Sequence, residues 1–100
     1  MKEITVTELS ALADPVVVDV REPWEYEAAH VPNVVHIPLG EVVARVGEIS
    51  TDGPVHVICA AGGRSAQVAE YLNAHGVDAI NIAGGTTAWQ QAGFAIEQGA

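Results

Sequence analysis

The chain has 100 residues, of which 49% are hydrophobic, and this size and composition predict a single domain over residues 1–100. Its 13 acidic side chains against 4 Lys and Arg give a formal net charge of -9, so the surface repels phosphate backbones and anionic lipid headgroups. Nucleic acid and membranes are therefore not expected partners, and the single cysteine excludes an internal disulfide and a cysteine-rich zinc site.

Short apolar runs alternate with helical patterns along the whole chain. Strands are expected, in chain order, at Ile4–Val6, Val16–Val20, Val34–Ile37, Val55–Cys59 and Val77–Ile82. Helices are expected between them, from Thr7 to Leu12, Trp24 to Ala29, Gly40 to Ile49 and Ser65 to about His75, and finally around Trp89 up to Gly93. This alternation predicts an α/β fold with a parallel sheet between two layers of helices.

The segment after the fourth expected strand carries the candidate chemistry. It consists of Cys59, Ala60, Ala61, Gly62, Gly63, Arg64 and Ser65. Ligands of open α/β sheets bind beyond the carboxyl ends of the strands, where Cys59 lies. Small residues let the backbone curl so that its N–H groups point inward, and the following helix adds its own N–H groups and positive dipole end.

Such surroundings lower the pKa of a cysteine from ~8.5 to roughly 3.5–7.5. We therefore expect Cys59 to be a thiolate nucleophile, with Arg64 as a positive charge beside it that suits an anionic donor. A buried cysteine is more often an inert part of the core. The thiol, the glycine-bearing turn and the arginine within seven residues together favour a reactive site.

Loop length separates two kinds of anion chemistry. Cysteine-dependent phosphatases, and arsenate reductases on the same scaffold, use one more residue between Cys and Arg than the four found here, and Ser65 stands where their arginine would fall. The shorter loop suits a persulfide sulfur better than a phosphate, so sulfur transfer ranks first.

The pattern Cys59-x-x-Gly62-x-Arg64-Ser65 resembles the active-site loop of the rhodanese family. Two flanking stretches are similar to that family's other signatures. The first comprises Asp19 to Tyr26, Ala29 to Pro32 and His36 to Pro38, and the second comprises Ile80 to Gly85, Trp89 and Ala92 to Phe94. The three motifs occur in the family's order and cover nearly the whole chain.

The resemblance implies a three-layer fold with a central five-stranded parallel sheet. It also implies that Cys59 takes a sulfur atom from thiosulfate or a persulfide donor and passes it to cyanide, a thiol or a protein acceptor. Loop N–H groups from Ala60 to Ser65 would stabilise the persulfide and Arg64 would orient the donor. The resemblance implies no metal and no organic cofactor.

This chain departs from the family in its loop. Ala60 and Ala61 stand where members often carry polar or basic side chains, so Arg64 is the loop's only cation. Persulfides and polysulfides therefore stay open as donors beside thiosulfate. The alternative function is a sulfur-relay or partner-binding module with little turnover of its own.

The remaining polar residues are expected to be structural. The four histidines share no metal-ligand spacing, and Arg21 is expected to pair with Asp19 or Glu25. Glu22, Glu25 and Glu27 are expected to form a solvated helix face. The first residues contain no apolar signal region and no stretch approaches ~18 apolar residues, so the simplest expectation is a cytoplasmic protein.

Overall fold

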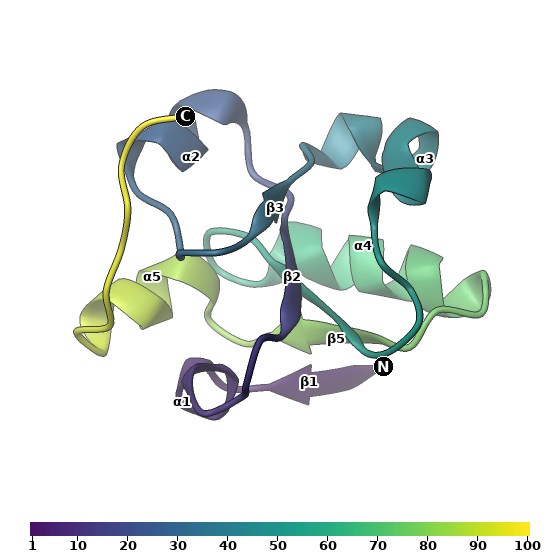
Figure 1. Ribbon diagram of the computed structural model, residues 1–100, viewed down its shortest axis with the longest axis horizontal. Helices are drawn as coiled ribbons and strands as arrows, with labels where there is room; N and C mark the ends of the chain where they lie inside the picture. The colour runs from purple at the N-terminus through teal and green to yellow at the C-terminus, as the bar shows by residue number, and fades with distance from the viewer.

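In the computed structural model, which describes residues 1–100, five strands form one sheet and every neighbouring pair is parallel. The strands lie in the order β1-β5-β4-β2-β3 (Figure 1). Their bounds are Lys2–Ile4 for β1, Val16–Asp19 for β2, Val35–His36 for β3, Val55–Ile58 for β4 and Ala79–Ile82 for β5. The predicted α/β fold with a five-stranded parallel sheet is confirmed.

Helices cover both faces of the sheet, as the doubly apolar strands require. The α-helices are α1 (Val6–Ser10), α2 (Pro23–Ala28), α3 (Val42–Arg45), α4 (Gly63–Ala74) and α5 (Gly85–Gln91). One apolar cluster joins the sheet to α3 and α4, through residues such as Val57, Val42 and Leu72. A second cluster on the opposite face joins the sheet to α1 and α5, through Leu9 and Trp89.

The first helix begins earlier than expected, because Thr5 rather than Thr7 caps it. The Thr5 hydroxyl accepts from the Glu8 N–H at 3.1 Å, and the Glu8 carboxylate accepts from the Thr5 N–H at 3.0 Å. This reciprocal cap needs a Thr three residues before a Glu, a spacing that Thr5 has and Thr7 lacks. Val6 consequently belongs to the helix, where it is buried.

The expected helix over Gly40–Ile49 is broken into three short turns. A 3-10 turn at Leu39–Glu41 (η1) precedes α3, and a second at Val46–Glu48 (η2) follows it. The apolar positions Val42, Val46 and Ile49 still face the core, since Val42 and Ile49 are buried and Val46 packs against their cluster. The apolar positions that predicted this helix were Val42, Val43 and Val46, but Val43 is 66% exposed, and the expectation of one continuous helix was wrong.

The last residues run back along α2 (Figure 1). His30 and Glu97 exchange two backbone hydrogen bonds of 2.8 Å, and the Gly99 N–H donates to the Glu27 carbonyl at 2.9 Å. The carboxyl-terminal segment is therefore hydrogen-bonded to α2 and to His30 just beyond its end. No helix in the chain is long and apolar enough to cross a bilayer.

Candidate active site

Cys59 directly follows β4, and its side chain faces the layer of α3 and α4 together with Val55 and Val57. The residue is only 1% exposed. Its sulfur accepts a hydrogen bond from the Gly62 N–H at 3.1 Å, and the Ser65 hydroxyl lies 3.3 Å away on the first turn of α4. The loop therefore closes around the sulfur.

Two opposing effects act on the pKa of Cys59. Burial raises the pKa of this thiol, because it disfavours the charged form. Hydrogen bonds from the Ser65 hydroxyl and from the N–H groups of Ser65, Gly62 and Ala61 lower it. The hydrogen bonds outweigh burial, and the pKa lies below its ordinary value of 9.0. The site stabilises a thiolate.

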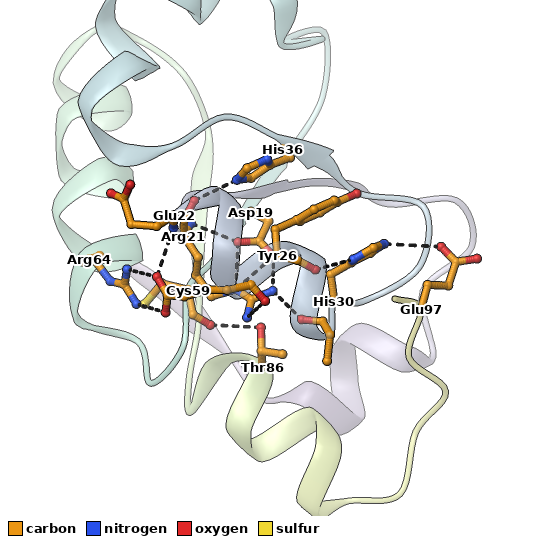
Figure 2. A network of polar contacts seen from close by, with 12 residues as sticks. Asp19, Arg21, Glu22, Tyr26, His30, His36, Cys59, Arg64, Thr86 and Glu97 are labelled. Atoms are coloured by element: carbon orange, nitrogen blue, oxygen red, sulfur yellow. Dashed lines mark hydrogen bonds and ion pairs between the residues drawn. The ribbon is translucent and has the colours of Figure 1, made fainter. Parts of the chain in front are cut away.

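The second glycine-bearing turn explains why the N–H groups of this loop point inward. The carbonyls of Cys59 and Ala60 accept from the N–H groups of Thr86 and Thr87 at 2.9 and 3.0 Å. The Thr86 hydroxyl also donates to the Cys59 carbonyl at 3.2 Å (Figure 2). Because these carbonyls turn toward α5, their peptide N–H groups turn away from it. Gly85, at a φ of 56°, lies so close that a Cβ atom would meet the Ala60 carbonyl oxygen at 2.7 Å.

Arg64 is bound by Glu25 of α2. Its guanidinium donates to both carboxylate oxygens, at 2.6 and 2.9 Å. This bidentate pair lowers the pKa of Glu25 from 4.5 to about 2, although burial acts in the opposite direction. The expectation that Glu25 is a solvated surface residue was wrong, since its side chain is only 13% exposed. The structure places Arg64 in the loop as expected but with its charge facing a carboxylate.

The buried ion pair of Asp19 and Arg21 holds α2 against the end of β2 (Figure 2). The Arg21 guanidinium lies 2.9 Å from the Asp19 carboxylate and donates to the backbone carbonyls of Glu25 and Ala29 at 3.3 and 2.8 Å. Of the two partners expected for Arg21, Asp19 is correct, whereas the Glu25 carboxylate goes to Arg64. This scaffold sets the position of Glu25.

The histidines near α2 are structural. Tyr26 is stacked between the rings of His30 and His36, with centroids 3.7 and 4.3 Å away (Figure 2). His30 shares a hydrogen bond with the Tyr26 carbonyl and His36 with the Arg21 carbonyl. No three His, Cys, Asp or Glu side chains lie close enough together to hold one metal ion.

A shallow hollow borders Glu25. It is lined by Arg21, Trp24, Glu25, Ala28, Ala29 and Gln90. Trp24 stands at the rim of this hollow and is 72% exposed. A second hollow lies on the opposite side of the sheet, between α1 and the segment after His30, and it has no lining residue in common with the Cys59 loop.

The structure brings all seven expected loop residues, from Cys59 to Ser65, into one turn. Besides Thr86 and Thr87 of α5, sequence reasoning missed two residues that touch this turn. One is Glu25, the partner of Arg64. The other is Asn81 of β5, whose side chain contacts both Gly62 and Ser65. A signal for Asn81 was present, because it is the one polar residue in the buried strand Ala79–Ile82.

The protein thus has a parallel sheet and, at the carboxyl edge of that sheet, a loop that stabilises a thiolate. Comparison with known proteins identifies the family that has this fold. The family model described as Rhodanese-like domain matches residues 5–92, and the chain belongs to this family. The crystal structure of a rhodanese-like domain protein from Staphylococcus aureus superimposes with a TM-score of 0.89 at 34% identity, covering 100% of both chains.

Relatives carry names that refer to sulfur. A protein of Allochromatium vinosum named "Sulfurtransferase" is 33% identical over 89 residues, which cover 88% of this chain and 83% of that protein. The Bacillus subtilis protein named "Putative sulfur carrier protein YrkF" is 43% identical over 74 residues, 73% of this chain. The match covers only 40% of that relative's length. At the general level these relatives support a sulfurtransferase.

Proposed function

We propose that this protein transfers a sulfane sulfur from a small donor to an acceptor through a persulfide on Cys59. The observation that carries this proposal is the thiol at the end of β4, held by N–H and O–H donors that lower its pKa. A loop that stabilises a thiolate also suits a persulfide anion, which places its charge one atom further out.

The first step is a displacement at sulfur. The Cys59 thiolate attacks the outer sulfur of thiosulfate, a new S–S bond forms, and the old S–S bond breaks as sulfite leaves with the electron pair. In the second step cyanide or a thiolate attacks the outer sulfur of the Cys59 persulfide, and the Cys59 thiolate leaves. The electrons balance within each exchange, so no external oxidant or reductant is needed.

The charges around the loop favour donors that carry a single negative charge. Arg64 is the loop's only cation and Glu25 already binds it with both carboxylate oxygens. A dianion such as thiosulfate has to compete with this carboxylate and with a formal net charge of -9. A thiol persulfide that carries a single negative charge on its sulfur meets less repulsion, so we propose that it is the better donor.

Intact-mass measurement tests the function directly. The protein is incubated with thiosulfate or with a thiol persulfide, freed of donor and then treated with cyanide. We expect a gain of one sulfur atom at Cys59 that is lost when thiocyanate is released, with the persulfide loading Cys59 faster than thiosulfate. A protein that gains no sulfur from either donor would contradict the proposal. Phosphate-ester hydrolysis, measured in parallel, should be absent.

A further inference from the structure

Asn81 holds the Cys59 loop from the neighbouring strand. Its amide nitrogen donates to the Glu3 carboxylate at 2.8 Å and to the Gly62 carbonyl at 3.3 Å. Glu3 is its partner in the register between β1 and β5, which lie side by side (Figure 1). Neither acceptor has a proton to donate, so the amide nitrogen must face them. The Asn81 oxygen therefore faces Ser65, whose Oγ lies 2.6 Å away.

The Ser65 hydroxyl has one proton and two buried acceptors. One acceptor is the Asn81 oxygen at 2.6 Å and the other is the Cys59 sulfur at 3.3 Å. Ser65 and Asn81 are 0% and 2% exposed, so no bulk water substitutes for a lost bond. Only one of the two acceptors can receive this proton at a time.

The protonation state of the Cys59 sulfur determines which of the two acceptors receives the Ser65 proton. When Cys59 is a neutral thiol, its S–H donates to the Ser65 oxygen and the Ser65 proton goes to Asn81. When Cys59 loses its proton, the thiolate is the stronger acceptor and the Ser65 hydroxyl turns toward it. The Asn81 oxygen is then left buried without a donor, which is unfavourable.

We propose that Asn81 is a positioning residue that competes with the Cys59 sulfur for the single proton of Ser65 and so limits how far the loop stabilises the thiolate. Thiolate nucleophilicity falls as its stabilisation grows, so this competition preserves reactivity. Given the sulfur transfer proposed above, the Ser65 proton follows the charge on the sulfur through both steps. It faces Asn81 when Cys59 carries the persulfide sulfur and faces Cys59 when the thiolate leaves.

The charged groups around the site belong to four elements. They are Glu3 on β1, Asp19 and Arg21 at the end of β2, Glu22 and Glu25 at the start of α2, and Arg64 on α4. Carboxylates and guanidinium groups keep their charge over the pH range in which a cysteine ionises. The competition for the Ser65 proton is therefore separable from the titration of its neighbours.

The pH dependence of alkylation by iodoacetamide tests the inference, because Cys59 is the only cysteine and each modified molecule reports its ionisation. Asn81→Leu removes the competing acceptor, and we expect the pKa of Cys59 to fall by about half a unit to one unit. Ser65→Ala removes the donor and should raise the pKa by about one unit. When Ser65→Ala and Asn81→Leu are combined, the change at Asn81 should not shift the pKa of Cys59 further, because the Ser65 hydroxyl that links Asn81 to the sulfur is absent.

Gln67→Leu is the matched control, since it replaces an exposed amide on α4, the helix that carries Ser65, by leucine and should leave the pH profile of alkylation unchanged. An unchanged or raised pKa in Asn81→Leu, or additive effects in the double variant, would overturn the inference. If Asn81→Leu does not fold, Asn81→Ala removes the same acceptor with a smaller side chain.

A measurement on the unmodified protein needs no variant at Asn81. The side-chain amide resonances of Asn81 should titrate with the pKa of Cys59 and should lose this titration in Cys59→Ser. Resonances that stay constant while Cys59 ionises would refute the competition. Alkylation and resonance positions do not depend on sulfur transfer, so either outcome is distinguishable from failure of the proposed function.

Discussion

At the scale of single residues, the site is built from one nucleophile and donors that surround it closely. Cys59 is almost fully buried, yet its pKa lies below the ordinary value because the hydrogen bonds to sulfur outweigh burial. A cysteine that was only a core residue would show the opposite shift. The donors at the Cys59 sulfur, from the Gly62 N–H and the Ser65 hydroxyl, therefore favour a functional interpretation of this residue over an inert one.

Replacing the nucleophile should abolish function without unfolding the protein. Cys59→Ser keeps the size of the side chain but replaces a thiolate by a hydroxyl that stays protonated. We expect no sulfur loading and no thiocyanate formation, with a thermal midpoint close to that of the wild type. Sulfur transfer at the wild-type rate in this variant would show that Cys59 is not the carrier.

Glu25 gives a pH dependence of stability whose sign follows from its pKa. The value falls from 4.5 to about 2 on folding, because Arg64 donates to the ionised carboxylate. The stabilisation is fully present above 4.5 and is lost as the pH falls toward about 2. We expect the wild type to be more stable than Glu25→Gln at neutral pH and the two to converge on acidification.

Urea denaturation at a series of pH values measures this difference. Glu70→Gln is the control, because Glu70 is an exposed acid on α4 and takes part in none of the ion pairs. A difference between wild type and Glu25→Gln that stays constant down to about 2 would contradict the assignment of this pair.

At the scale of elements, the two glycine-bearing turns act as one unit. The turn before α4 holds the sulfur, and the first residues of α5 bind the carbonyls of Cys59 and Ala60. This contact requires glycine at position 85. The residue has a positive φ, and the space between the two turns is too small for a Cβ atom. The shape of the first turn is thus determined by the second.

We therefore expect Gly85→Ala to perturb the Cys59 loop, although the two positions are far apart in the sequence. A side chain in the left-handed region is strained by about 1–3 kcal/mol, and the added Cβ would push against the loop carbonyls. We expect lower stability in urea and slower alkylation of Cys59 at neutral pH. Gly47→Ala is the control, because nothing lies within 4 Å of its added Cβ and its φ is not positive. Equal behaviour of the two variants would contradict this role of Gly85.

Sequence patterns predicted the elements that depend on local signals. The apolar run Val16–Val20 and the helical pattern around Trp89 up to Gly93 identify their structures within a residue or two, and the pairing of Arg21 with Asp19 spans only a short stretch. The contact of Arg64 with Glu25 joins positions 39 residues apart, and that of Asn81 with Glu3 joins positions 78 apart. No local periodicity encodes such pairs, so the loop was predictable and its surroundings were not.

At the scale of the whole molecule, one buried ion pair connects the sheet to α2 and so to the site. Asp19 and Arg21 are 0% and 5% exposed, and Arg21 also satisfies two backbone carbonyls near the end of α2. Buried charges of this kind are stable only as a complete set. Loss of Asp19 or Arg21 should therefore lower the stability of the whole fold.

Asp19→Ala leaves the Arg21 charge buried and unpaired, so we expect it to reduce the free energy of unfolding by about 3–5 kcal/mol. Urea denaturation measures the loss. Glu41→Ala, which removes an exposed partner of Arg45, should change stability little. Similar effects of both variants would show that the Asp19 pair contributes no more than a surface contact.

The strand order also bears on when the thiol becomes reactive during synthesis. β5 lies between β1 and β4, so the first strand has no neighbour in the sheet until β5 has emerged from the ribosome. The Asn81 amide and the N–H groups of Thr86 and Thr87 that complete the loop arrive equally late. A nascent chain halted before α5 lacks the N–H groups that bind the carbonyls of Cys59 and Ala60, so the loop around the thiol reaches its final shape only after α5 has been synthesised.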